Sequence, residues 1–199
     1  MLSPEPMLFD TCMDILRDHY GPLDCMSEVW AWDKTNYYQT EMGTGILRKF
    51  IFCEQLIDPV LLPQIKLFTN DLEKKFTLPG PGPVRRRINI DPGYVTEAKV
   101  VLATTKDFSH RIYIGSGMYA EVTLRYSLRE RRFMSTDYTY PDYRSEAYAT
   151  MFNRARDQLR AALLTPIAGG GLGRKPRKSY TVVDETGAGD DDTSGAADS

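Results

Sequence analysis

The sequence has few cysteines, no long hydrophobic run and no excess of charge of one sign. Cys12, Cys25 and Cys53 form neither a CxxC pair nor a Cys/His cluster, so we expect no zinc site. An odd number of cysteines predicts reduced thiols in the core, as in most cytoplasmic proteins. No stretch reaches the roughly 20 apolar residues that cross a membrane. The start, MLSPEP, lacks both a basic and an apolar signal region, so the sequence predicts a cytoplasmic protein.

The charges of the chain nearly cancel. Its 25 Lys and Arg residues stand against 27 Asp and Glu residues, which makes the formal net charge −2. Such a chain has no general attraction to nucleic acid or to an anionic membrane, so we expect no membrane partner and no strong nucleic-acid interaction. Hydrophobic residues make up 42%, which is enough for the core of one compact domain. The oligomeric state stays open.

Apolar residues recur at helical spacing in three segments, which predicts helices over residues 7–20, 58–76 and 145–164. Alternating or continuous apolar runs predict strands over residues 25–32, 46–57, 85–91, 98–104, 110–114, 118–126 and 132–135. Residues 1–164 are therefore expected to form one α+β domain. A glycine run, a basic run and an acidic run follow from residue 165, which predicts that residues 165–199 are a disordered tail.

The order of these elements indicates a particular arrangement. Helix, strand, strand, helix and strand follow one another, and only a leading strand is needed to complete a ferredoxin-like βαββαβ unit. We therefore predict a ferredoxin-like sheet whose first strand is missing. Antiparallel hairpins extend this sheet, and a C-terminal helix follows. Gly115-Ser116-Gly117 marks one of the hairpins.

Six distinctive runs occur in order along the chain: TNYYQTEMG (35–43), FIFCEQLIDP (50–59), IKLFTNDLE (65–73), RRINIDPGY (86–94), KVVLATTKDFSHRIYIGSGMYAEVTLRY (99–126) and TYPDY (139–143). In these runs the chain resembles the bacterial and archaeal domain-of-unknown-function family numbered 4416, over residues 1 to about 160. Members of that family usually begin with a short apolar strand of the type KLFVG, which this chain lacks before Met1. The resemblance implies that the start lies further upstream or that the sheet lacks an edge or central strand.

Some members of the family are labelled GTP-binding proteins, so the resemblance makes GTP or another nucleotide a candidate ligand. The sequence has no GxxxxGK[ST] motif to hold the phosphates. Its nearest glycine run ends in Gly173-Arg174-Lys175-Pro176, where proline stands in place of Ser or Thr. A P-loop GTPase is therefore not expected.

Polar residues alternate with apolar ones along the strands predicted between residues 85 and 126. Strand alternation places Glu121 and Arg125 on one side of a strand, with Arg111 and Arg87 on other strands. If the sheet curls, a set of residues converges as a binding site for a phosphorylated small molecule or nucleotide, namely Arg87, Tyr94, Lys106, Arg111 and Arg125. The alternative is a solvated outer face with cross-strand ion pairs.

Three titratable residues in the same region, Asp91, His110 and Glu121, are candidates for catalysis. A histidine beside carboxylates can move protons, and carboxylates beside arginines can hold Mg²⁺. No metal-ligand spacing is present, so Mg²⁺ is only a candidate cofactor and no residue is assigned as a metal ligand. The alternatives are that His110 hydrogen-bonds its own turn and that Asp91 closes an Asx-turn.

Five tyrosines lie outside the predicted helices and strands: Tyr37, Tyr38, Tyr138, Tyr140 and Tyr143. They either stack on the ring of a ligand or pack over the ends of the sheet.

Three functions are compatible with these residues. The first is a binding or regulatory domain that recognises a phosphorylated small molecule or nucleotide through the polar sheet face. The second is a metal-assisted or acid–base enzyme that acts on a phosphorylated substrate through Asp91, His110 and Glu121. The third is a nucleic-acid or protein interaction module. The sequence favours the first function and leaves open whether the protein is an enzyme.

Overall fold

The computed structural model describes residues 1–32, 38–79, 85–164 and 180–183. The predicted roles of Tyr37 and of residues 165–179 and 184–199 therefore lie outside the described residues. Among the described helices, none has the length and apolar character needed to cross a membrane.

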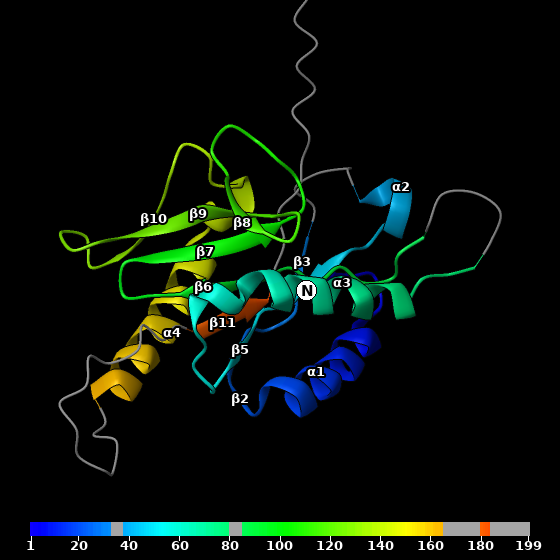
Figure 1. The fold of residues 1–199 in the computed structure, drawn as a ribbon, viewed down its shortest axis with the longest axis horizontal. Coiled ribbons are helices and arrows are strands. Elements are labelled where there is room, and N and C mark those ends of the chain that lie inside the picture. Colours follow the sequence, from blue (N-terminus) through cyan, green and yellow to red (C-terminus); the bar gives the residue numbers. More distant parts are fainter. Residues whose placement is uncertain (33–37, 80–84, 165–179, 184–199) are drawn as a thin grey trace, which may run out of the picture.

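The α+β class is confirmed by a larger and a smaller antiparallel sheet with helices packed around them (Figure 1). The larger sheet has the order β10-β9-β7-β6-β11-β5-β2, and β8 pairs with β9. Its strands are β2 (Leu23–Met26), β5 (Ile51–Cys53), β6 (Pro92–Val95), β7 (Lys99–Thr104), β8 (Ile112–Gly115), β9 (Met118–Ser127), β10 (Arg132–Ser135) and β11 (Tyr180–Val183). The smaller sheet consists of β1 (Leu2–Ser3), β4 (Leu47–Arg48) and β3 (Trp30–Ala31). This order does not establish the ferredoxin-like arrangement, which stays a prediction.

Three long helices match the predicted segments closely, namely α1 (Pro6–Tyr20), α3 (Leu62–Lys75) and α4 (Glu146–Leu164). Short helices α2 (Gln39–Met42), η1 (Pro59–Leu61) and η2 (Pro141–Arg144) lie in the connections. Asp58 begins the α3 region as predicted, since its side chain accepts a hydrogen bond from the Val60 amide at 3.0 Å. Ser145 likewise receives the Tyr148 amide at 3.3 Å at the start of α4.

The larger sheet is covered on both faces, and strand alternation explains how. Phe50 and Phe52 point to the face that α4 covers with Phe152, and all three are fully buried. Ile51, between them, points to the opposite face and packs in the cluster that contains α1 and Leu72 of α3. Each face of β5 therefore contributes to a separate hydrophobic core.

Two predicted strands are wrong in their continuity. Residues 25–32 form β2 in the larger sheet and β3 in the smaller one, and residues 46–57 divide in the same way into β4 and β5. Residues 85–91 form no named strand and make only isolated bridges, Leu78 with Arg85 and Leu2 with Asn89. The first two segments each pass from one sheet to the other, which a local apolar pattern cannot reveal.

Strand β11 occupies a central place in the larger sheet. It pairs antiparallel with β6 over four residues and with β5 at one, Val182 opposite Phe52. The expectation of a disordered tail therefore does not extend to Tyr180–Val183.

Candidate functional site

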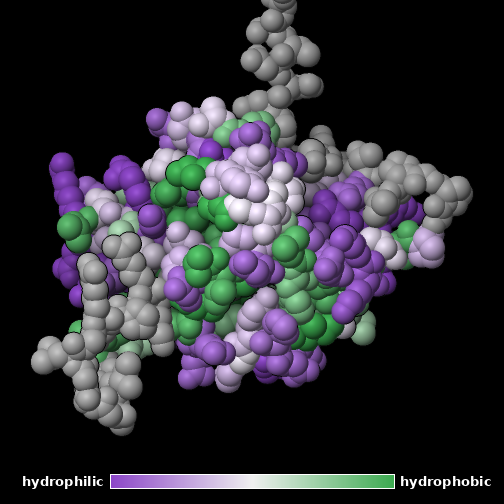
Figure 2. All heavy atoms as spheres, viewed as in Figure 1, coloured by the Kyte–Doolittle hydropathy of each residue, from purple (hydrophilic) through white to green (hydrophobic). Residues whose placement is uncertain are grey.

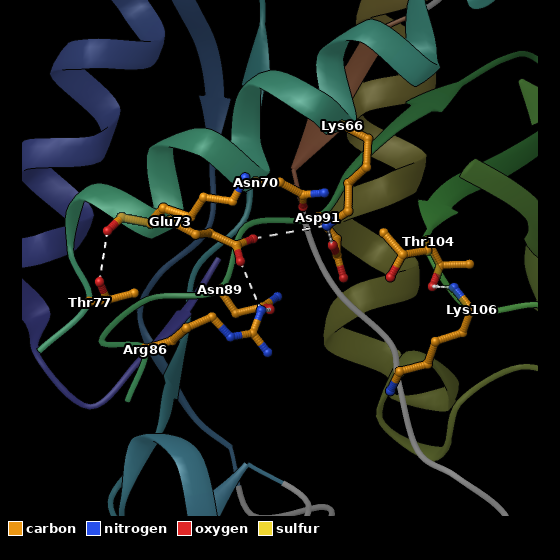
Figure 3. A pocket seen from close by; sticks show the side chains of 11 residues that line it. Lys66, Asn70, Glu73, Thr77, Arg86, Asn89, Asp91, Thr104 and Lys106 are labelled. Atoms are coloured by element: carbon orange, nitrogen blue, oxygen red, sulfur yellow. Dashed lines mark hydrogen bonds and ion pairs between the residues drawn. The ribbon is translucent and has the colours of Figure 1, made fainter. Parts of the chain in front are cut away.

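A polar pocket of about 300 Å³ lies between α3, the segment of residues 86–91 and the end of β7 (Figure 3). Its lining residues are all polar: Lys66, Asn70, Glu73, Lys74 and Thr77 from α3 and its end, Arg86, Asn89 and Asp91 from the segment, and Thr104, Thr105 and Lys106 from the end of β7. Three stretches that are distant in sequence therefore supply one site.

Helix geometry explains the contribution of α3. Lys66, Asn70, Glu73 and Thr77 are spaced by four, three and four residues, so they share one face of the helix. Ile65 and Leu72 point away from this face and are buried, Leu72 in the cluster with α1. A polar stripe on an otherwise amphipathic helix was the sequence signal for this pocket, and the strand-based interpretation missed it.

Lys66 is the most deeply buried cation of the pocket, with 5% of its side chain exposed. Its ammonium contacts the Asp91 carboxylate, lies 3.9 Å from Glu73 Oε1, and donates to the Ile90 carbonyl at 3.3 Å. Burial lowers the pKa of Lys66 to about 8, against the attraction of Glu73, and the Arg86 guanidinium adds to the lowering. Burial therefore brings the pKa of Lys66 closer to physiological pH than that of an exposed lysine.

An ion pair between Glu73 and Arg86 lies on another wall of the polar pocket. Glu73 Oε1 accepts the Ile90 amide at 2.8 Å, and its Oε2 accepts a guanidinium N–H of Arg86 at 2.8 Å. Arg86 also makes a bidentate pair with Glu41, at 2.6 and 2.7 Å. Burial alone lowers the pKa of Arg86, but the hydrogen bonds and charges of Glu41 and Glu73 outweigh it and raise the pKa. Arg86 thus stays a cation at every relevant pH.

Asn89 is fully buried at the base of this network. Its Oδ1 accepts from Arg86 at 2.7 Å, whereas its Nδ2 has no hydrogen-bond partner within the part of the chain that the structure describes. A buried amide without a partner costs stability, so such a group often marks a place where another molecule binds.

A second polar cluster sits at a break in the edge of β9. One edge of β9 pairs with β7, while the other pairs with β8 at residues 118–120 and with β10 at residues 124–127. In the break between β8 and β10 lies Glu121, which is 5% exposed. Its Oε2 accepts Arg111 Nε at 2.8 Å and lies 3.3 Å from His110 Nε2. Two of the three predicted catalytic residues are therefore in contact.

Aromatic rings surround His110. The Tyr138 ring stacks on it with centroids 4.6 Å apart, and the Phe108 ring lies nearly parallel at 6.1 Å. His110, Glu121, Tyr94 and Tyr138 also line a wider hollow of about 610 Å³ on the sheet. The hydrophobic wall of this hollow includes Ile112, which is 71% exposed, and Figure 2 shows hydrophobic side chains over β8 and the start of α3 on this face.

The structure divides the predicted catalytic and binding residues among several places. Asp91 and Lys106 line the polar pocket, Tyr94, His110 and Glu121 line the wider hollow, and Arg111 and His110 line a third hollow with Tyr138. Arg87 instead pairs with Glu5, the residue that precedes α1. Arg125 is exposed and lines none of these three places. The predicted convergence of all four cations on one sheet face does not occur.

A β-bulge in β9 explains why this convergence fails. Val101 aligns with Val122 but Val100 aligns with Leu124, so Thr123 is an extra residue in β9. An extra residue reverses the alternation of side chains beyond it. Glu121 and Arg125 therefore lie on opposite faces, contrary to the prediction that they share one.

The predicted tyrosine cluster also separates. Tyr38 and Tyr143 are each 1% exposed and pack in two different cores, as the packing alternative predicts. Tyr138 is 61% exposed and stacks only on His110 among the ring contacts described. No group of three or more His, Cys, Asp or Glu residues within the described ranges is placed to hold a metal ion.

The comparison with protein families decides the classification of the chain. The model of a family described as a domain of unknown function, DUF4416, matches residues 1–159, which is most of the chain. The chain belongs to the DUF4416 family. This DUF4416 match contains every residue that lines the polar pocket and the two hollows, and it ends before β11. A search of the curated proteins finds no match, and a search of the solved structures finds none.

Proposed function

We propose that this DUF4416 protein binds a small anionic molecule, of the phosphorylated class, in the polar pocket beside α3. The observation that carries the proposal is the convergence of Lys66, Arg86 and Lys106 with the buried Asn89 amide, because these donors come from three separate stretches of chain. Charge-assisted hydrogen bonds from lysine and arginine are the usual means of holding phosphate oxygens.

For binding of a phosphate, the individual hydrogen-bond donors of this pocket matter more than its net charge. Four cationic and two acidic side chains line it, but Arg86 also pairs with Glu41 and Lys74 with Asp71. An entering phosphate would compete with Asp91 for the Lys66 ammonium, and it would also meet Lys106, Asn89 Nδ2 and the hydroxyl groups of Thr104 and Thr105. The volume of about 300 Å³ is at the lower end for ligand pockets, which favours a phosphate on a small carrier over an entire nucleotide.

The direct test is a thermal-shift and calorimetry panel of inorganic phosphate, small sugar phosphates, phosphorylated acids, GTP and ATP. Wild-type protein is compared with Lys66→Met and with the control Lys75→Met, which removes an exposed lysine of the same helix that does not line the pocket. We expect a phosphorylated compound to bind wild type and Lys75→Met but not Lys66→Met. Equal binding by all three proteins, or by none, contradicts the proposal.

A second candidate function is acid–base catalysis at His110, and the contact of His110 Nε2 with Glu121 favours it. A buried carboxylate that holds one ring nitrogen orients the imidazole and leaves the other nitrogen for a substrate proton. Asp91 belongs to the other pocket, so this function would rely on His110 and Glu121 alone. The test is a phosphatase and esterase substrate panel with wild type and His110→Asn, in which only wild type should turn over a substrate.

A further inference from the structure

Strand β11 is the only hydrogen-bonded link between two halves of the larger sheet, within the part of the chain that the structure describes. On one side of it lie β6, β7, β9 and β10, and on the other lie β5 and β2. Val182 aligns with Gly93 of β6 and with Phe52 of β5. The position between β5 and β6 is therefore a slot that requires an extended strand.

The walls of this slot are deeply buried. Ile51, Phe52 and Cys53 of β5 and Val95 of β6 are each at most 1% exposed. Backbone N–H and C=O groups in such strands need partners, because a buried polar group without a hydrogen bond costs roughly 1–3 kcal/mol. Without β11, the facing edges of β5 and β6 would present unpaired backbone groups, and such edges favour the addition of a strand.

The strand that fills the slot comes from outside the family domain. The DUF4416 match ends at residue 159, α4 ends at Leu164, and β11 begins at Tyr180. The 15 intervening residues, 165–179, can span up to about 50 Å when extended. This length is sufficient for Tyr180–Val183 to reach a neighbouring molecule.

We propose that the slot between β5 and β6 is a docking groove for an extended strand, and that Tyr180–Val183 of a second copy of this chain can occupy it. Exchange of the strand makes the same backbone pairs between two chains that β11 makes within one. The equilibrium between the monomer and the strand-exchanged dimer then depends on protein concentration and on the length of the linker, as in domain swapping.

Pairs of engineered cysteines across the groove can distinguish β11 bound within its own chain from β11 exchanged between two chains. Thr181 of β11 lies opposite Tyr94 of β6, so the full-length Thr181→Cys/Tyr94→Cys chain is oxidised and separated without reductant. The control is Thr181→Cys/Tyr113→Cys, because Tyr113 is on β8 and away from the groove. We expect cross-linking within one chain in dilute protein and a cross-linked dimer after unfolding and refolding at high concentration. A cross-link that stays within one chain at every concentration overturns strand exchange.

A strand-breaking variant tests the groove without a disulfide. In full-length Val182→Pro, proline removes the backbone N–H of the residue that aligns with both neighbouring strands. A fluorescent peptide of residues 178–185 should bind this variant at least about tenfold more tightly than it binds wild type, whose tethered strand competes at roughly millimolar effective concentration. A variant with Ser194→Pro, beyond β11, should behave as wild type. Folded Val182→Pro protein that does not bind the peptide overturns the groove.

Discussion

Lys66 and Asp91 form a buried ion pair that ties the middle of α3 to the residue that precedes β6. The side chains of both residues are at most 5% exposed. The pair therefore belongs to the fold and to the polar pocket at once, and its removal should affect both.

Removing one partner of this pair should destabilise the protein strongly. Lys66→Met or Asp91→Asn alone leaves an uncompensated buried group, which typically costs about 3–5 kcal/mol of unfolding free energy. The double variant should lose clearly less than the sum of the two single variants, because neither charge is then left alone. Urea denaturation of the four proteins measures this coupling. Strict additivity would show that the two side chains do not interact in solution.

Stability should rise with pH where Lys66 titrates. Its pKa of about 8 in the folded protein lies below the ordinary lysine value of 10.5, so between these values the unfolded chain binds more protons than the folded one. Wild type should gain about 1 kcal/mol relative to Lys66→Met between pH 7 and pH 9. Burial also raises the pKa values of the Cys12 and Cys53 thiols from 9.0 to about 12. The stability that these buried neutral thiols contribute is therefore lost as pH rises above 9. Both proteins contain these thiols, so their titration cancels in the difference between wild type and Lys66→Met. A difference that stays flat from pH 7 to pH 9 would contradict the prediction.

Arg111 and Arg125 should differ sharply although the sequence makes them look alike. Arg111 is 1% exposed in its side chain and neutralises the buried Glu121, so Arg111→Met should cost about 3 kcal/mol or more. Arg125 is exposed, and Arg125→Met should change the unfolding free energy by no more than about 0.5 kcal/mol. Thermal and urea unfolding of the two matched variants measures the difference. Similar losses would contradict the placement of Glu121 and Arg125 on opposite faces of β9.

Gly93 should tolerate no side chain. A Cβ at this position would lie 2.3 Å from the Val101 carbonyl oxygen and 2.6 Å from the Leu102 side chain. Gly93→Ala should therefore force β6 away from β7 and cost about 2–4 kcal/mol, in the range of severe packing faults. Gly43→Ala is a useful comparison, because no described residue other than its chain neighbours lies within 4 Å of its Cβ position, and its positive φ of 85° is what opposes the change. The loss at Gly93 should exceed the loss at Gly43 in urea denaturation.

The regular elements were largely predictable from the sequence. The helices α1, α3 and α4 and the β8–β9 hairpin agree with their predicted ranges within a few residues. The polar pocket is predictable only in part: the sequence points to Asp91 and Lys106 as site residues but not to Lys66 and Glu73. The sequence pattern places these two residues in a predicted helix, and nothing local to the sequence shows what a helix face packs against.

The sequence by itself determined which stretches become helices and strands and which family the chain belongs to, because these depend on local spacing and on the order of residues. Only the tertiary structure decided the partners: Lys66 with Asp91, Arg111 with Glu121, and Arg87 with Glu5. Residues 86–91 form no regular strand, and one extra residue in β9 reverses its alternation. Side-chain direction in such places depends on the backbone path and on distant neighbours, which a periodic pattern does not contain.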